Sequence, residues 1–282
     1  MTLNVRVMLY RAAWRLLIPI MFLALWGYLA AYTENEIILP QVTQVFELLG
    51  HPSTSLISMG SLATNILVSL ARVMAGYFLA LLIAVPLGVL MGYYGSLFNL
   101  LNGFLGLFRP IPPLAWVPLV LAWFGVASMA TVLGIQMGTG YVYLNNLKLS
   151  MIFIIFIGAF YPILTSSIHG VRNVKKTLVD SARVLGATEL SIFRKILFPA
   201  AAPSIVTGMR IGLGVGWMCL VSAEMLPGSI SGVGYLITHA YTVARTDIVI
   251  AGMISIGVVG ALLDLLFRYV EDKKFGWQRL AK

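Results

Sequence analysis

Charged side chains are scarce in this chain, and acidic residues are scarcer than basic ones. Only 10% of the 282 residues are charged, with 10 Asp and Glu against 19 Lys and Arg, whereas a soluble globular domain has about 25% charged residues. Hydrophobic residues make up 60% of the chain. This composition excludes an ordinary soluble domain, because the uncharged runs follow one another with little room between them for a folded globule. We therefore expect a single all-α, polytopic membrane domain over residues 1–282.

The residues that usually build catalytic or metal sites are also few. The one cysteine, Cys219, lies in an apolar run, which excludes a disulfide within the chain and a zinc cluster. The three histidines, His51, His169 and His239, are dispersed without metal-ligand spacing. No phosphate-binding loop of the G-x-x-x-x-G-K-[ST] type occurs in the sequence. The chain is predicted to be non-catalytic, with no metal or cofactor of its own, and a membrane-embedded enzyme is disfavoured because His, Asp, Glu and Cys do not cluster.

Long apolar runs are what the sequence does have, and about six of them approach the roughly 20 residues that a spanning helix needs. The loop after the first run contains a predicted short surface helix, Val42–Leu49, and Pro86 is expected to bend the second span. The N-terminal run is interpreted as a retained span, because no clear cleavage site precedes Glu34. The expected spans are Leu16–Tyr32, one within Leu62–Tyr93, one beginning near Leu97, Leu149–Ile168, Phe198–Leu226 and Ile248–Phe267.

Fourteen of the 19 basic residues fall in three segments beside these runs. Basic residues near span ends favour the cytoplasm, so both termini and residues 172–195 are predicted to be cytoplasmic. That topology needs an even number of spans before residue 172, which makes Met129–Asn146 a re-entrant or outer-surface excursion. The three segments contain Arg6, Arg11 and Arg15; Arg172, Lys175, Lys176, Arg183, Arg194 and Lys195; and Arg268, Lys273, Lys274, Arg279 and Lys282.

A proline cluster, Arg109-Pro-Ile-Pro-Pro-Leu-Ala-Trp-Val-Pro, interrupts the third apolar run. Such a cluster predicts a broken helix, and irregular backbone at membrane depth occurs where it is buried or lines a cavity. Arg109 lies about halfway along this run, where it can attract an anionic substrate. The alternatives are that Arg109 pairs with an acidic residue such as Glu224 or snorkels to an interface. Arg72 is expected near the outer end of its span, and Arg210 is expected to snorkel.

The polar segment before residue 199 has a distinctive spacing: Asp180-Ser-Ala-Arg-Val-Leu-Gly186, nine residues, then Ile196-Leu-Phe-Pro199. Leu178, Ala182 and Leu185 recur at i, i+4 and i+7 and predict an apolar stripe on a helix that Gly186 ends with a positive φ. A second short helix, Glu189–Leu197, is expected to carry Ile192, Phe193 and Ile196 on one side and to end where Pro199 returns the chain to the membrane. The alternative is that residues 172–195 form only a basic loop that lies on anionic lipid.

This spacing resembles the cytoplasmic EAA loop of ATP-binding-cassette (ABC) import permeases, with Asp180 for the usual glutamate, Ser181 for the first alanine and Phe198 for leucine. The resemblance implies the type I ABC importer permease fold and a coupling segment, about 172–199, that docks on separate ATPase subunits. The coupling residues it implies are Asp180, Ser181, Ala182, Gly186, Ile196, Phe198 and Pro199.

The proline cluster, Met209–Trp217 and Ala223–Leu226 are similar to permeases for nitrate, sulfonates, taurine or bicarbonate. The resemblance implies a multi-pass inner-membrane subunit that works with a second permease copy, two ATPases that bind ATP and Mg, and a periplasmic or lipid-anchored binding protein. Nucleic acid is not expected as a partner. Which anion crosses stays open. The rival is an ion-gradient-driven carrier or channel, for which only Glu224 and Asp264 offer acidic groups. The predicted translocation path comprises Arg109, Pro112, Pro113, Trp116, Trp217 and Glu224, although either tryptophan can equally serve in packing.

Overall fold

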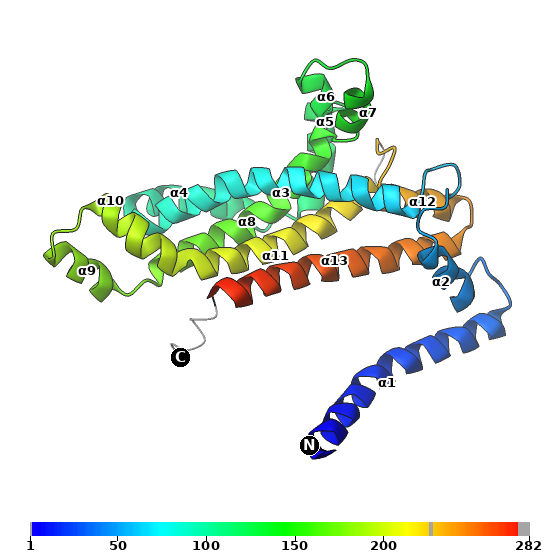
Figure 1. Ribbon diagram of the computed structural model, residues 1–282. Coiled ribbons are helices and arrows are strands. Elements are labelled where there is room, and N and C mark those ends of the chain that lie inside the picture. Colours follow the sequence, from blue (N-terminus) through cyan, green and yellow to red (C-terminus); the bar gives the residue numbers. More distant parts are fainter. Residues whose placement is uncertain (1, 226–227, 276–282) are drawn as a thin grey trace. The chain divides into compact units, whose positions relative to one another are not determined.

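The computed structural model describes residues 2–225 and 228–275, with the side chains of all of these except 2–13, 15 and 16. The chain divides into two compact units, residues 1–64 with 236–256 and residues 65–235 with 257–282. All of the elements in the described residues are helical, as predicted (Figure 1). They are α1 Thr2–Thr33, α2 Val42–Gly50, α3 Leu62–Tyr93, α4 Gly95–Phe108, a 3₁₀ turn Pro113–Trp116, α5 Val117–Phe124, α6 Met129–Val132, α7 Thr139–Asn145, α8 Leu149–Arg172, α9 Lys176–Val184, α10 Glu189–Ile192, a π-helical turn Phe193–Leu197, α11 Phe198–Glu224, α12 Val233–Thr242 and α13 Thr246–Phe275.

The first unit is organised around the contact between α1 and α2. Trp26, Ala30, Val45 and Ala251 form its buried cluster. The Trp26 indole donates a hydrogen bond to the Pro40 carbonyl at 3.1 Å, which ties α1 to the loop before α2. The predicted short helix at Val42–Leu49 is confirmed by α2.

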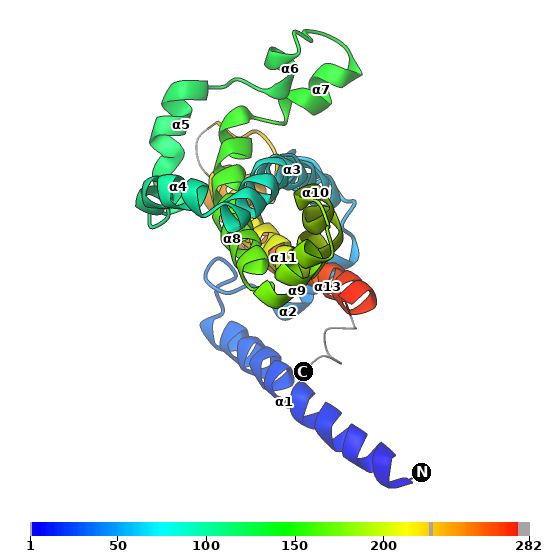
Figure 2. The ribbon, with the colours of Figure 1, turned by 90° about the vertical axis from the view of Figure 1, so that its left-hand side faces the viewer.

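The second unit is built on α3, α8 and α11, which lie side by side (Figure 2). Small residues let these helices approach closely, as in other membrane bundles. A Cβ on Gly88 of α3 would lie 2.6 Å from the Ser167 Cβ of α8, and one on Gly212 of α11 would lie 2.7 Å from Ile163 Cγ1 of α8. These glycines therefore act in packing.

Within the residues that the structure describes, four helices are long and apolar enough to span a membrane: α3, α8, the continuous helix Glu189–Glu224 and α13. A fifth candidate is the pair α4 and Pro113–Phe124, bent by 81°, so the predicted proline break is confirmed. The first predicted span contributes only Leu17–Thr33 among the described residues, which is shorter than the roughly 20 residues of a full span. The predicted number of about six spans is therefore approximate, and Leu226, at the end of the fifth, lies outside the described residues.

Two local features differ from the sequence-based expectations. The helix that begins at Glu189 does not end near Leu197 but continues through the π-helical turn into α11. Pro199 directly follows this π-helical turn, where the regular i→i−4 hydrogen-bond pattern is already interrupted, so its missing N–H is tolerated. The helix α12, Val233–Thr242, was not expected.

Residues 129–146 form only α6 and α7, which are too short to cross a bilayer, in agreement with the predicted excursion.

Candidate functional site

The segment with the distinctive spacing folds into α9 and α10, which project at one end of the second unit (Figure 1). Gly186 has a φ of +81°, so the predicted glycine end of the first helix is confirmed. The Gly186 amide donates to the Arg183 carbonyl at 2.9 Å and the Ala187 amide to the Ala182 carbonyl at 3.0 Å. Thr188 then caps α10 by accepting a hydrogen bond from the Ser191 amide.

The apolar residues of this segment face two ways. Val179, Ala182 and Phe193 pack against a buried cluster that includes Ile192 and Leu197. The expected stripe is therefore divided: Ala182 is half-buried against the body, whereas Leu178 and Leu185 are 52% and 87% exposed. We call the exposed set the apolar tip; it consists of Leu178, Val184, Leu185 and Leu190.

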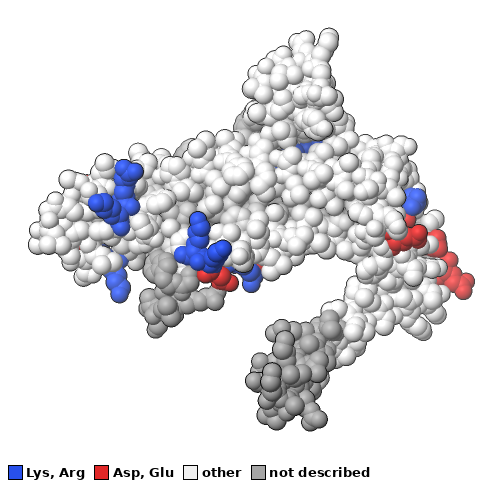
Figure 3. Space-filling view, in the orientation of Figure 1, with Lys and Arg blue, Asp and Glu red and all other residues white. Residues whose placement is uncertain are grey.

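Charged contacts hold α9 against α10. Arg183 donates to Glu189 at 2.9 Å and lies 3.7 Å from Asp180, and the Tyr93 hydroxyl of α3 bonds to Glu189. Asp180 is exposed apart from this contact within α9. Ser181, Phe198 and Pro199 are also exposed, while Ile196 is half-buried. Lys and Arg gather at this end of the unit, whereas the middle of α3 shows almost no charge on the face drawn in Figure 3.

Arg109 caps the C-terminus of α4 at the 81° bend. With Pro113 it lines a cavity of about 390 Å³, whose opposite walls come from α8 and α11. The α8 wall includes Tyr161 and Ser166, and the α11 wall includes Ile211; Tyr161 and Ile211 lie near the midpoints of their helices. Arg109 has no ion-pair or hydrogen-bond partner among the described residues, and the described lining contains no Asp or Glu.

The other residues predicted for the path do not gather around Arg109. Pro112 is exposed beside it. The Trp116 ring lies 5.9 Å from the Phe108 ring and 6.4 Å from the Phe153 ring, and its buried indole N–H has no hydrogen-bond partner in the described part of the chain. Trp217 is only 3% exposed and is buried in this unit.

Glu224 is fully buried and pairs with Arg72, not with Arg109. Arg72 Nη1 lies 2.6 Å from Glu224 Oε1, and both side chains are 0% exposed. The expectation that Arg72 lies towards the end of its span did not include this burial. Each residue nevertheless carries a sequence signal, because Arg72 is the only charge in Leu62–Tyr93 and Glu224 the only acid in Phe198–Leu226.

A polar network surrounds this ion pair and joins four segments of the second unit. The Ser69 hydroxyl lies 2.9 Å from both carboxylate oxygens of Glu224, and the Gly234 amide donates to Glu224 Oε2 at 3.1 Å. Arg72 also donates to the carbonyls of Asn146 and Ser231, each at 2.7 Å. The network thus connects α3 and α11 to the turns before α8 and α12.

A glycine and a lysine border the network. Gly232 has a φ of +108°, and any Cβ there would collide with the Glu224 carboxylate. Lys148, 9% exposed, donates to the Val126 carbonyl at 3.3 Å. Burial lowers the pKa of Lys148, and the nearby charge of Arg72 lowers it further.

Arg210 of α11 is also paired, lying 3.4 Å from Glu271 and 3.8 Å from Asp264.

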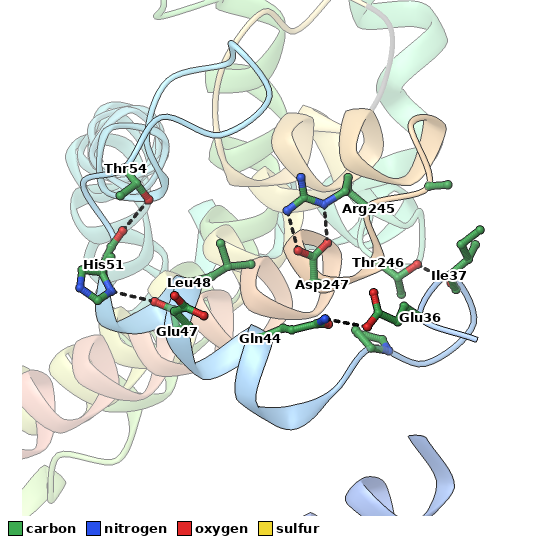
Figure 4. A pocket seen from close by; sticks show the side chains of 12 residues that line it. Glu36, Ile37, Gln44, Glu47, Leu48, His51, Thr54, Arg245, Thr246 and Asp247 are labelled. Atoms are coloured by element: carbon green, nitrogen blue, oxygen red, sulfur yellow. Dashed lines mark hydrogen bonds and ion pairs between the residues drawn. The ribbon is translucent and has the colours of Figure 1, made fainter. Parts of the chain in front are cut away.

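The first unit contains a larger cavity of about 700 Å³ (Figure 4). Its lining includes Glu36, Glu47 and Asp247 against a single Arg245, together with His51. Arg245 donates to Asp247, and Gln44 donates to Glu36 at 2.8 Å. Within the described residues no group of three or more His, Cys, Asp or Glu is placed to hold a metal ion. The acidic lining disfavours an anionic ligand.

Comparisons with known proteins agree with one another. Residues 84–276 match the family described as binding-protein-dependent transport system inner membrane component. A protein of Methanocaldococcus jannaschii named as an ABC transporter permease is 47% identical, over 94% of this chain and 92% of its own length. The taurine transport system permease protein of Escherichia coli is 30% identical, over 89% of this chain and 84% of its own.

The nitrate import permease protein of Leptolyngbya laminosa is 35% identical, over 74% of this chain and 67% of its own length. Among solved structures, a chain of the MetNI methionine ABC transporter in an inward-facing conformation superposes with a TM-score of 0.59. That match covers 75% of this chain and 94% of the other at 17% identity, so the likeness concerns the fold alone.

Proposed function

Since the chain belongs to the family of binding-protein-dependent transport system inner membrane components, we propose that it forms half of the translocation path for a small oxyanion. As an ABC importer permease subunit it is a multi-pass membrane protein. The proposed substrates are taurine or another sulfonate, nitrate, or bicarbonate. Relatives named for taurine and nitrate support this class, and the single observation that carries it in this chain is the unpaired Arg109 in a cavity without described acidic groups.

The proposed assembly contains a second copy of the chain, two ATPase subunits and a periplasmic or lipid-anchored binding protein. ATP and Mg bind to the ATPases, and this chain is non-catalytic. Both termini and the coupling segment, about 172–199, face the cytoplasm of an inner membrane; Arg279 and Lys282, which contribute to that assignment, lie outside the described residues. The exposed apolar tip supports docking at this segment, because four large apolar side chains in water are disfavoured unless a partner covers them.

The path is proposed to run past Arg109, Pro112, Pro113 and Trp116, with Trp217 and Glu224 supporting it from the packed interior. An ion-gradient-driven carrier finds less support. Its two candidate acids are already paired, Glu224 with Arg72 at 2.6 Å and Asp264 with Arg268 at 2.7 Å.

Reconstitution tests this proposal. The permease, its ATPase and its binding protein are placed in proteoliposomes, and uptake of taurine, ethanesulfonate, nitrate and bicarbonate is measured with and without ATP. We expect ATP-dependent uptake of at least one of these oxyanions. Uptake of none of them, with the ATPase active and the binding protein folded, would contradict the proposal.

A further inference from the structure

Two hydroxyl groups accompany Arg109 in the cavity at the bend. Tyr161 and Ser166 of α8 line it, and neither hydroxyl has a hydrogen-bond partner among the described residues. The third hydroxyl of the lining, that of Thr165, is different because it donates to the Tyr161 carbonyl at 2.8 Å. The cavity therefore combines one unpaired guanidinium with two unpaired hydroxyl donors.

This combination fits the chemistry of an oxyanion. A guanidinium presents five N–H donors in a planar fork, and each hydroxyl adds one donor. Sulfonate, nitrate and bicarbonate have several acceptor oxygens and no need for an acidic partner. The remaining lining side chains that face this group are largely apolar, including Ile157, Ile211 and Val215, and apolar walls strengthen such contacts by lowering the local dielectric.

The position in the fold agrees with this chemistry. Tyr161 and Ile211 lie near the midpoints of α8 and α11, and the break between α4 and α5 forms the facing wall. Unpaired charge at mid-membrane depth is costly and therefore marks functional positions. Discontinuous helices often surround a transport site. We infer that Arg109, Tyr161 and Ser166 form a transient oxyanion-binding site within the permease itself, and that these donors determine which anions pass. This inference rests on the proposed transport of an oxyanion.

Thiol labelling of the full chain tests the charge selectivity of this cavity without any transport. Cys219, the one native cysteine, is replaced by alanine, and Ile211→Cys, at a cavity-lining position 48% exposed, serves as the reporter. The purified chain reacts with the sulfonate-bearing reagent 2-sulfonatoethyl methanethiosulfonate or the cationic 2-(trimethylammonium)ethyl methanethiosulfonate. The ratio of the two rates cancels any change in the reactivity of the thiol itself.

We expect Arg109→Gln to lower the anionic-to-cationic rate ratio by about tenfold or more, because a single charge in a low-dielectric cleft raises the local concentration of its counter-ion. Arg109→Lys is expected to keep most of the ratio. The matched control is Arg268→Gln, which removes the same charge from α13 outside the cavity. In the protein that keeps Arg109, added nitrate or taurine should slow the reaction of the cysteine reporter with the anionic reagent. This protection should weaken in the Tyr161→Phe or Ser166→Ala variant.

A ratio unchanged by Arg109→Gln, or lowered equally by Arg268→Gln, would overturn the inference. Val215→Cys provides a second reporter in the same cavity if the first variant does not fold. Failure of the inference is distinct from failure of the proposed function. If the assembled transporter imports an oxyanion but Arg109→Gln leaves the anionic-to-cationic rate ratio unchanged, only the proposed internal site is wrong. If the transporter imports no oxyanion, the proposed function is wrong whatever the labelling shows.

Discussion

At the scale of single residues, the Arg72–Glu224 pair is the most enclosed charge in the described part of the chain. Removing two charges from water costs several kcal/mol per ion, and the mutual attraction offsets this only where further hydrogen bonds satisfy both groups. The Ser69 hydroxyl, the Gly234 amide and two backbone carbonyls supply those bonds. The pair therefore fixes how α3, α11 and two turns meet, although it adds little net stability.

Breaking one side of this pair is predicted to destabilise the chain strongly. Glu224→Gln leaves Arg72 buried without a counter-charge, and such losses typically cost about 3–5 kcal/mol. The measurement is the thermal unfolding midpoint of the purified protein in detergent. Arg72→Met combined with Glu224→Gln should recover part of the loss, because it removes the uncompensated charge.

The control for that prediction is Glu47→Gln, which removes an exposed carboxylate and should leave the midpoint unchanged. A Glu224→Gln protein that melts with the native one would show that the network does not depend on the ionic contact.

At the scale of elements, α9, Gly186 and α10 behave as one projecting unit. The segment is held from within by Val179, Ala182 and Phe193, while Leu178 and Leu185 face outward. Changes at the exposed face should therefore affect partners more than folding.

Gly186→Val is predicted to reduce binding of the ATPase. A Cβ at Gly186 meets nothing within 4 Å, so the obstacle is its φ of +81°, which a β-branched residue rarely adopts. Co-purification of the ATPase with the tagged permease measures the effect. Gly103→Ala is the matched control, since its Cβ also meets nothing within 4 Å and its φ is not in the left-handed region. Full retention of the ATPase by Gly186→Val would remove Gly186 from the coupling segment.

Leu185→Glu tests the apolar tip separately from backbone strain. Leu185 is 87% exposed, so a charged replacement should change the unfolding midpoint little. If the tip docks on the ATPase, the substitution buries an unpaired charge in the interface and should weaken binding by tenfold or more, corresponding to at least about 1.4 kcal/mol. Titration of the purified ATPase onto the permease gives the measurement. Unchanged affinity would assign the tip another role, such as contact with lipid.

At the scale of the whole molecule, the chain has no phosphate-binding loop. Glu224 and Asp264, the two acids that an ion-gradient-driven carrier could use, are each paired with an arginine. We predict that the purified chain alone, in proteoliposomes, neither hydrolyses ATP nor accumulates taurine or nitrate against a gradient. Addition of the ATPase and the binding protein should establish uptake. Accumulation by the chain alone would favour the ion-driven carrier instead.

The sequence alone determined the helical membrane class, a span within Leu62–Tyr93, the break after Arg109 and the glycine end of α9, because each depends on local chemistry: apolar run length, proline and a positive φ. It also indicated the transport family through the spacing from Asp180 to Pro199. Only the tertiary structure decided that Glu224 pairs with Arg72, that Leu185 faces outward while Ala182 packs inward, and that Tyr161 and Ser166 share a cavity with Arg109. The reason is that these relations join residues distant in the chain, and their partners follow from how the helices pack against one another, which run length and local spacing do not specify.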